Sequence, residues 1–207
     1  MTAAQRERAA LVETMRAAGP DAPTLCEGWK ARDLAAHLVV RERRLDASAG
    51  ILVPQLAGYT ARVQDQVTAA TDWPDLVDKI ASGPPLYSPF KLLDPLVNVA
   101  EMFIHNEDVR RAQSTWEPRA LDHDTIKALA RQIPMMARMT MSKSPARVTL
   151  TTPEGKTLAT VGNGAPVTIC GEPGELLLFV AGRGPAHITF TGDDDAVAAV
   201  RDAPRGV

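Results

Sequence analysis

The residues with the clearest chemical potential are a carboxylate and an imidazole four residues apart, Glu101 and His105. On a helix this spacing puts the two side chains one turn apart on the same face. Ala100 and Ile104 make that face apolar, and Asp108 follows on it one turn later. A carboxylate on an apolar face needs a partner, which a divalent metal shared with the imidazole would supply. The pattern therefore indicates either a metal site or a buried Glu–His hydrogen-bonded pair.

A second histidine, His37, falls between Leu34 and Leu38 on the apolar face of another predicted helix. Metal ligands in helical bundles come from inward positions on facing helices. His37, Glu101 and His105 are therefore candidates to converge in the core. Two histidines and one carboxylate leave a coordination position open, as in catalytic metal sites. Without a metal, His37 would be an unrelated core histidine.

Apolar periodicity and breakers predict the elements that must position these side chains. Helices are expected over about 3–18, 31–48, 55–70, 73–81, 91–113 and 124–139. After residue 145 the texture changes to β-branched runs separated by Pro and Gly, in the order strand, strand, strand, helix, strand, helix. We therefore expect a mainly α, four-helix-bundle domain over 1–145 and a small α+β domain over 146–207.

Composition limits the classes of function that need consideration. The 207 residues are 45% hydrophobic and 23% charged, which is typical of a globular protein. The net charge of -2 argues against nucleic-acid binding. Charged residues interrupt the N-terminal segment, and no apolar run approaches the length of a membrane span. With only two cysteines, no disulfide scaffold is possible. The expected setting is cytoplasmic, without membrane or nucleic-acid partners.

Two segments carry a family resemblance: TLCEGWKARDLAAHLVVRE at 24–42 and NVAEMFIHNEDVRRA at 98–112. They contain, in order, C-x-G-W, D-[LV]-x-x-H-L and E-x3-H-x-x-D. This pattern resembles the DinB/YfiT-like metalloprotein superfamily, in particular its mycothiol-dependent maleylpyruvate isomerase type and the actinobacterial metal-binding members of unassigned substrate. The segments from Arg147 onward are similar to the C-terminal α+β domain of that type. The DinB-like resemblance thus covers nearly the whole chain.

The resemblance implies a divalent metal, usually zinc, held by His37, Glu101 and His105. The same ligands also suit iron, nickel or manganese. Asp108 matches a trailing aspartate of the family, which implies that it orients a ligand or anchors a neighbouring backbone group. Arg183, in a Gly-Arg-Gly turn of the second domain, matches an arginine near the site of the isomerases and is the candidate catalytic residue.

The implied reaction uses a low-molecular-weight thiol, mycothiol by resemblance, as a thiolate that attacks an electrophilic carbon of a small-molecule substrate. A conjugated alkene would give isomerisation, whereas an alkyl or epoxide carbon would give S-transfer. Two alternatives stay open. One is a metal-dependent hydrolase using metal-bound hydroxide, with Asp108 as the nearby carboxylate. The other is a non-catalytic metal- or ligand-binding module. The substrate, the metal and the choice between monomer and homodimer are not fixed by the sequence.

Two further residues lie close to the predicted ligands along the chain. Cys26, in the loop that leads into the helix of His37, is a reactive thiol, a fourth ligand or inert packing, and packing is favoured. Arg41 follows His37 by one turn, so that it either faces the mouth of the site or is solvated at the surface. The surface position is favoured for Arg41.

Overall fold

The computed structural model describes residues 1–48, 53–86 and 88–205. Its contacts divide the chain into two compact units, Met1–Glu117 and Pro118–Val207. The first unit is helical, and the second contains a four-stranded sheet. The predicted fold class, a mainly α part followed by a small α+β part, is confirmed. In the part of the chain that the structure describes, no helix is both long and apolar enough to cross a bilayer.

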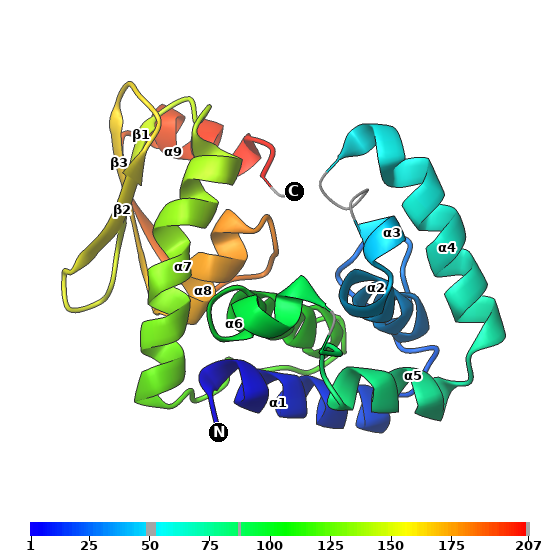
Figure 1. Ribbon diagram of the computed structural model, residues 1–207. Helices are drawn as coiled ribbons and strands as arrows, with labels where there is room; N and C mark the ends of the chain where they lie inside the picture. The colour runs from blue at the N-terminus through cyan, green and yellow to red at the C-terminus, as the bar shows by residue number, and fades with distance from the viewer. Residues whose placement is uncertain (49–52, 87, 206–207) are drawn as a thin grey trace. The chain divides into compact units, whose positions relative to one another are not determined.

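The first unit consists of helices (Figure 1). They are α1 (Ala3–Ala18), α2 (Ala31–Arg43), α3 (Leu45–Ser48), the 3-10 turn η2 (Pro54–Leu56), α4 (Ala57–Ala70), α5 (Trp73–Ala81) and α6 (Pro89–Arg110). The expected helix over 31–48 is interrupted at Arg44, whose ψ of 77° is not helical. The structure therefore resolves it into α2 and the single turn α3.

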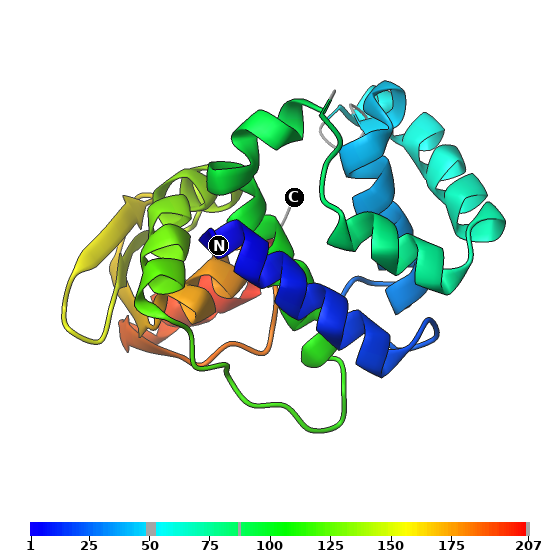
Figure 2. The same cartoon turned by 60° about the horizontal axis from the view of Figure 1, so that its bottom comes forward.

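Helix α1 makes its most extensive packing contact with α6, and Figure 2 shows the two side by side. The core joins one apolar stripe from each of four helices. Its members include Leu11 and Met15 of α1, Leu34 and Leu38 of α2, Leu76 and Ile80 of α5, and Met102 and Val109 of α6. Burying side chains of this size stabilises the unit by roughly 1.5–3 kcal/mol each. The same packing fixes α2 against α6, the two helices that carry the predicted ligands.

Local signals set the helix boundaries. Thr2 and Gln5 form a reciprocal capping box at the start of α1, and Gly19 ends that helix with a φ of 83°. At the start of α2, Asp33 accepts a hydrogen bond of 3.0 Å from the backbone N–H of Lys30. Pro74 lies in the first turn of α5, where its missing N–H costs little. These boundaries fix the register of α2 and therefore the face that carries His37.

The second unit packs three helices against a sheet (Figure 1). Its elements are α7 (His123–Met141), β1 (Arg147–Thr151), β2 (Thr157–Val161), β3 (Pro166–Gly171), α8 (Pro173–Val180), β4 (Ile188–Gly192) and α9 (Asp194–Asp202). The strand order is β2-β1-β3-β4, with β1 and β3 parallel and the two outer pairs antiparallel. The predicted order of strands and helices after residue 145 agrees with this arrangement.

Helix α7 decides where the second unit begins. Its buried residues Leu129, Ile133, Ala137 and Met141 form one stripe, and the helix packs against α8 and β2. The contacts therefore divide the chain after Glu117, whereas the sequence placed the boundary near residue 145, where the β-branched runs begin. The change in texture marks the start of the sheet, not the start of the compact unit.

Candidate metal centre

Helices α2 and α6 bring together the three residues expected to bind a metal. Nε2 of His105 lies 3.3 Å from Oε1 of Glu101, and Nε2 of His37 lies 3.9 Å from the same oxygen. The two imidazole rings meet edge to face, with centroids 5.7 Å apart. All three ligand atoms lie within 4.8 Å of one another. Residues separated by more than sixty positions in the sequence thus form one cluster.

The spacing of these atoms fits a divalent cation. Nitrogen and oxygen ligands of tetrahedral zinc lie about 2.0–2.1 Å from the metal, and therefore about 3.4 Å from one another. The His105–Glu101 distance of 3.3 Å matches this value, and the His37–Glu101 distance of 3.9 Å exceeds it by about half an ångström. The Glu101 side chain is 26% exposed, so that the cluster is reachable from solvent. The donor set therefore fits a cation with an open position.

Asp108 contacts the opposite side of the His105 ring. Its Oδ2 lies 2.9 Å from Nδ1 of His105, and its side chain is fully buried. A carboxylate only accepts hydrogen bonds, so Nδ1 carries a proton that it donates to Asp108. In the neutral ring, the lone pair is then on Nε2, the atom that faces Glu101. This is the contact that an orienting role for Asp108 requires.

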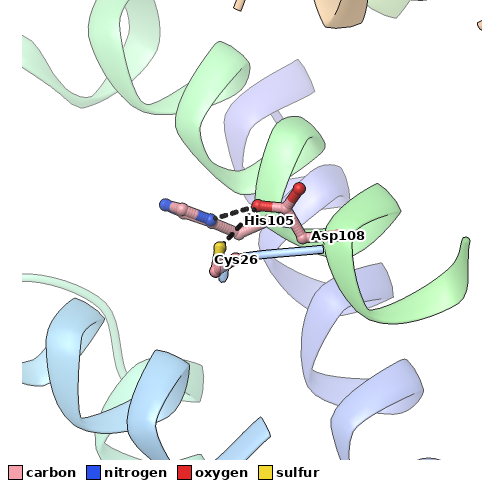
Figure 3. A group of neighbouring side chains, drawn as sticks. All are labelled: Cys26, His105 and Asp108. Carbon is pink, nitrogen blue, oxygen red and sulfur yellow. Dashed lines mark hydrogen bonds and ion pairs between the residues drawn. The ribbon is translucent and has the colours of Figure 1, made fainter. Parts of the chain in front are cut away.

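Cys26 shares this carboxylate (Figure 3). Its Sγ lies 3.2 Å from Oδ2 of Asp108, which places the thiol on the Nδ1 side of His105. The sequence favoured inert packing for this cysteine, and the structure instead gives it a polar partner. The C-x-G-W and E-x3-H-x-x-D segments meet only through tertiary packing. Their local spacing in the sequence therefore does not indicate the contact between Cys26 and Asp108.

Arg41 is buried beside Glu101, contrary to the surface position that the sequence favoured. Its Nε lies 3.2 Å from Oε1 of Glu101, and its Nη1 donates a 2.8 Å hydrogen bond to Oδ1 of Asn98. The side chain is only 7% exposed. The signal that could have found it is its position one turn after His37 on α2, which puts both side chains on one face. Sequence reasoning also missed Asn98, which holds the guanidinium.

The charges of the cluster follow from burial and from these contacts. Burial and the proximity of His105 lower the pKa of His37 to about 4. Burial opposes ionisation of Glu101, but the His105 hydrogen bond and Arg41 outweigh it and hold the carboxyl pKa below its usual range. Burial also disfavours the charged His105 ring, but Asp108, the thiol beside it and Glu101 hold its pKa well above the usual value. A metal would therefore displace a proton from His105 but not from His37.

The remaining predicted residue, Arg183, belongs to the second unit. It follows α8 and donates a 3.3 Å hydrogen bond from Nη1 to the carbonyl oxygen of Ala181. Two other residues accompany the cluster in the first unit. The Trp29 ring lies 5.1 Å from the His37 ring, centroid to centroid, and Nε2 of Gln64 donates a 3.4 Å hydrogen bond to the backbone oxygen of Asp33, one turn before His37 on α2. Neither was predicted as part of the site.

Two features define the class of this protein. They are a helical unit in which two histidines and a glutamate lie together and a small α+β unit that follows it. The model of the mycothiol maleylpyruvate isomerase N-terminal domain family matches residues 1–170. The chain therefore belongs to the mycothiol maleylpyruvate isomerase N-terminal domain family, as the sequence motifs indicated. No match was found among curated protein sequences.

Two solved structures share the fold. One is a crystal structure of a histidine-to-alanine mutant of the mycothiol-dependent maleylpyruvate isomerase, with a TM-score of 0.54 and 13% identity. The other is a crystal structure of the mycothiol-dependent maleylpyruvate isomerase, with a TM-score of 0.52 and 15% identity. Each comparison covers 91% of this chain and 90% of the other. At these identities the similarity shows the fold alone.

Proposed function

We propose that the protein is a mycothiol-dependent isomerase of small unsaturated acids of the maleylpyruvate type. His37, Glu101 and His105 hold a divalent cation, with zinc as the first choice. The observation that carries the proposal is the convergence of three ligand atoms within 4.8 Å, from two helices, in a chain of this family. The reaction takes place in the cytoplasm, where thiols remain reduced.

The protein's own residues prepare the site in two ways. Asp108 accepts a hydrogen bond from Nδ1 of His105, which leaves Nε2 facing Glu101 as the atom that would bind a cation after losing its proton. Arg41, held by Asn98, fixes Glu101 from the other direction. Both supporting residues are buried, so that the three ligand atoms are held in place before a cation or a substrate arrives.

A divalent cation held by His37, Glu101 and His105 would supply one chemical effect, which is to lower the pKa of a coordinated thiol so that thiolate is present at neutral pH. The thiolate sulfur adds to one alkene carbon of the substrate, and the electron pair moves to the conjugated carbonyl oxygen. The former double bond rotates, the pair returns, and the carbon–sulfur bond breaks to release the thiolate. The thiol is regenerated and no oxidant is consumed. With an alkyl or epoxide substrate, the same nucleophile would instead remain in the product.

Arg183 enters the proposal as a cation for the substrate's carboxylate. Arginine binds carboxylates in a two-pronged geometry that lysine does not reproduce. Arg183→Lys is therefore expected to raise KM with unchanged metal content. An unchanged KM for both Arg183→Lys and Arg183→Ala would show that Arg183 does not bind the substrate.

The contacts of Asp108 argue against the hydrolase alternative. A hydrolase needs a general base beside the open position. Asp108, the carboxylate expected to serve, is fully buried on the Nδ1 side of His105 and accepts hydrogen bonds from that ring and from Cys26. These contacts favour a role for Asp108 in orienting His105 over one as a general base.

Elemental analysis and an isomerase assay test the proposal together. Untagged protein is expected to contain about one divalent cation per chain and to isomerise maleylpyruvate only with added mycothiol. His105→Ala and His37→Ala should lose both the metal and the activity, and His123→Ala, at an exposed position on α7, should keep both. No metal after reconstitution would refute the mechanism and leave Glu101 and His105 as a structural pair. Metal without mycothiol-dependent turnover would favour a binding module.

A further inference from the structure

A second group of metal-ligand atoms lies on the Nδ1 side of His105 (Figure 3). It consists of Sγ of Cys26, Nδ1 of His105 and one side-chain oxygen of Asp108, all within 4.8 Å of one another. Oδ2 of Asp108 lies 3.2 Å from the sulfur and 2.9 Å from the nitrogen. Thiolate, imidazole and carboxylate are the three ligand types that zinc uses in proteins.

The spacing of this group is close to that of a zinc site. Tetrahedral zinc would separate the sulfur and oxygen by about 3.6 Å, and the nitrogen and oxygen by about 3.4 Å. The observed distances of 3.2 and 2.9 Å are shorter because protons now bridge the atoms. A cation replaces the thiol proton and the Nδ1 proton, and each contact then widens by only about half an ångström.

The backbone holds Cys26 at this position. The N–H of Leu25 donates a 3.0 Å hydrogen bond to the backbone oxygen of Asp108, which ties the loop to the end of α6. The N–H of Cys26 donates to Oγ1 of Thr24 at 3.2 Å, and the N–H of Trp29 donates to the oxygen of Cys26 at 3.0 Å. The thiol is therefore presented by a fixed turn, which lowers the entropy cost of binding.

Charge also favours a cation at this group. A thiolate at Cys26 and the carboxylate of Asp108 together carry two negative charges, which neutralise a divalent cation. In the group of His37, Glu101 and His105, the single carboxylate already pairs with Arg41 at 3.2 Å. Thiolate ligands select zinc and similar thiophilic ions over magnesium, calcium and manganese.

We propose that Cys26, His105 and Asp108 form a second site that is selective for thiophilic divalent cations. It competes for His105 with the first site, which consists of His37, Glu101 and His105. A neutral imidazole has one lone pair. When a cation occupies Nδ1, the proton is on Nε2, which then donates to Glu101 Oε1 at the observed separation of 3.3 Å. Occupation of the second site therefore withdraws His105 from the first, and thiophilic ions in excess act as inhibitors.

Cobalt(II) added to metal-free protein distinguishes the two sites, because a cobalt–thiolate bond gives a near-ultraviolet charge-transfer band that nitrogen and oxygen ligands do not give. The band is expected in the wild type, in His37→Ala and in Cys170→Ser, the matched control at the other cysteine. Cys26→Ser should lose the band while its visible cobalt spectrum reports binding at the first site. Loss of all cobalt from Cys26→Ser would count against the first site and not against the second.

Two results would overturn the second site. One is wild-type protein that binds cobalt without the thiolate band, and the other is wild-type protein that binds no cobalt. A readout independent of variants is the rate of alkylation at each cysteine, followed by mass spectrometry. Zinc should slow the alkylation of Cys26 and leave that of Cys170 unchanged. Equal rates at Cys26 with and without zinc would contradict the proposal.

Discussion

The metal-free protein should lose stability between pH 6.5 and pH 4 because of one buried histidine, His37. Its side chain is 13% exposed and packs beside the Trp29 ring. Burial lowers the pKa of His37 to about 4 in the folded protein, whereas an unfolded histidine has an ordinary value near 6.5. As the pH falls through this window, the unfolded chain binds a proton that the folded protein refuses. The stability is therefore complete above pH 6.5 and is lost as the pH approaches 4.

The magnitude follows from the width of the window. Each unit of pKa difference corresponds to about 1.4 kcal/mol, so a difference of about 2.5 units gives roughly 3 kcal/mol. In the folded protein, the ionisable groups beside His37 do not titrate within this pH range. The contacts of Glu101 hold its carboxyl pKa below the ordinary range, and those of His105 hold its imidazole pKa well above the ordinary value. In the folded protein neither group changes its charge between pH 4.5 and pH 6.5, and their titration in the unfolded chain cancels when wild type is compared with a His37 variant.

Urea unfolding in the presence of a chelator measures the effect, with tryptophan fluorescence as the signal. Trp29, Trp73 and Trp116 all lie in the first unit, so the signal reports the unit that holds the site. The comparison is between wild type and His37→Gln at several pH values. The stability difference between them should shift by roughly 3 kcal/mol from pH 7 to pH 4, toward the variant at low pH.

A control variant isolates the origin of this shift. His123→Gln, at an exposed position in the second unit, should follow the pH dependence of the wild type. If wild type and His37→Gln run in parallel across the whole range, the burial of a neutral His37 is refuted. Parallel curves would also remove the argument that Nε2 of His37 can bind a cation without first losing a proton.

Three further predictions address the buried polar groups. Asp108→Asn should weaken manganese binding at the first site by about 10–100-fold, measured from the free-ion signal in electron paramagnetic resonance, while Glu107→Gln leaves the affinity unchanged; equal affinities would mean that Asp108 does not orient His105. Asn106 is fully buried and has no hydrogen-bond partner among the described residues, so Asn106→Leu should raise the free energy of unfolding by about 1–3 kcal/mol, and a loss of stability would reveal a hidden partner. Arg8 donates a 3.0 Å hydrogen bond to buried Glu42; Arg8→Met should cost about 3–5 kcal/mol of unfolding free energy and adding Glu42→Leu should restore most of it, whereas additive losses would contradict a buried pair.

The parts of the fold that the sequence predicted share a local cause. Helix α5 was predicted with its observed bounds because Pro74 and the Gly83-Pro84-Pro85 segment bracket a short apolar pattern. The order of strands and helices after residue 145 was predicted for the same kind of reason. The sequence did not predict the unit to which α7 belongs, because an amphipathic stripe shows that a helix packs without showing which element covers it.

Helix α6 shows why the candidate site was only partly predictable. His105 could be selected because its own stripe is apolar. Asn98, Asn106 and Asp108 are also fully buried, so the helix is surrounded by protein at several faces. Polar residues in such positions are specified by partners from distant segments, as Arg41 is for Asn98. Hydrophobic periodicity registers only apolar faces, and it therefore assigns polar residues to solvent by default.

The position of Arg41 has a consequence for any metal bound by Glu101. Oε1 is the oxygen nearest to all three nitrogen partners, at 3.2 Å from Arg41, 3.3 Å from His105 and 3.9 Å from His37. A cation placed between the two histidines therefore shares this oxygen with a guanidinium that always carries a positive charge. Repulsion between the two cations would lower the affinity for the metal, and the ion pair with Arg41 keeps the carboxylate in place. A weaker but pre-oriented ligand leaves more positive charge on the cation, which favours ionisation of a coordinated thiol. Arg41 would thus act on the same property that the proposed reaction needs, the acidity of a thiol bound to the cation.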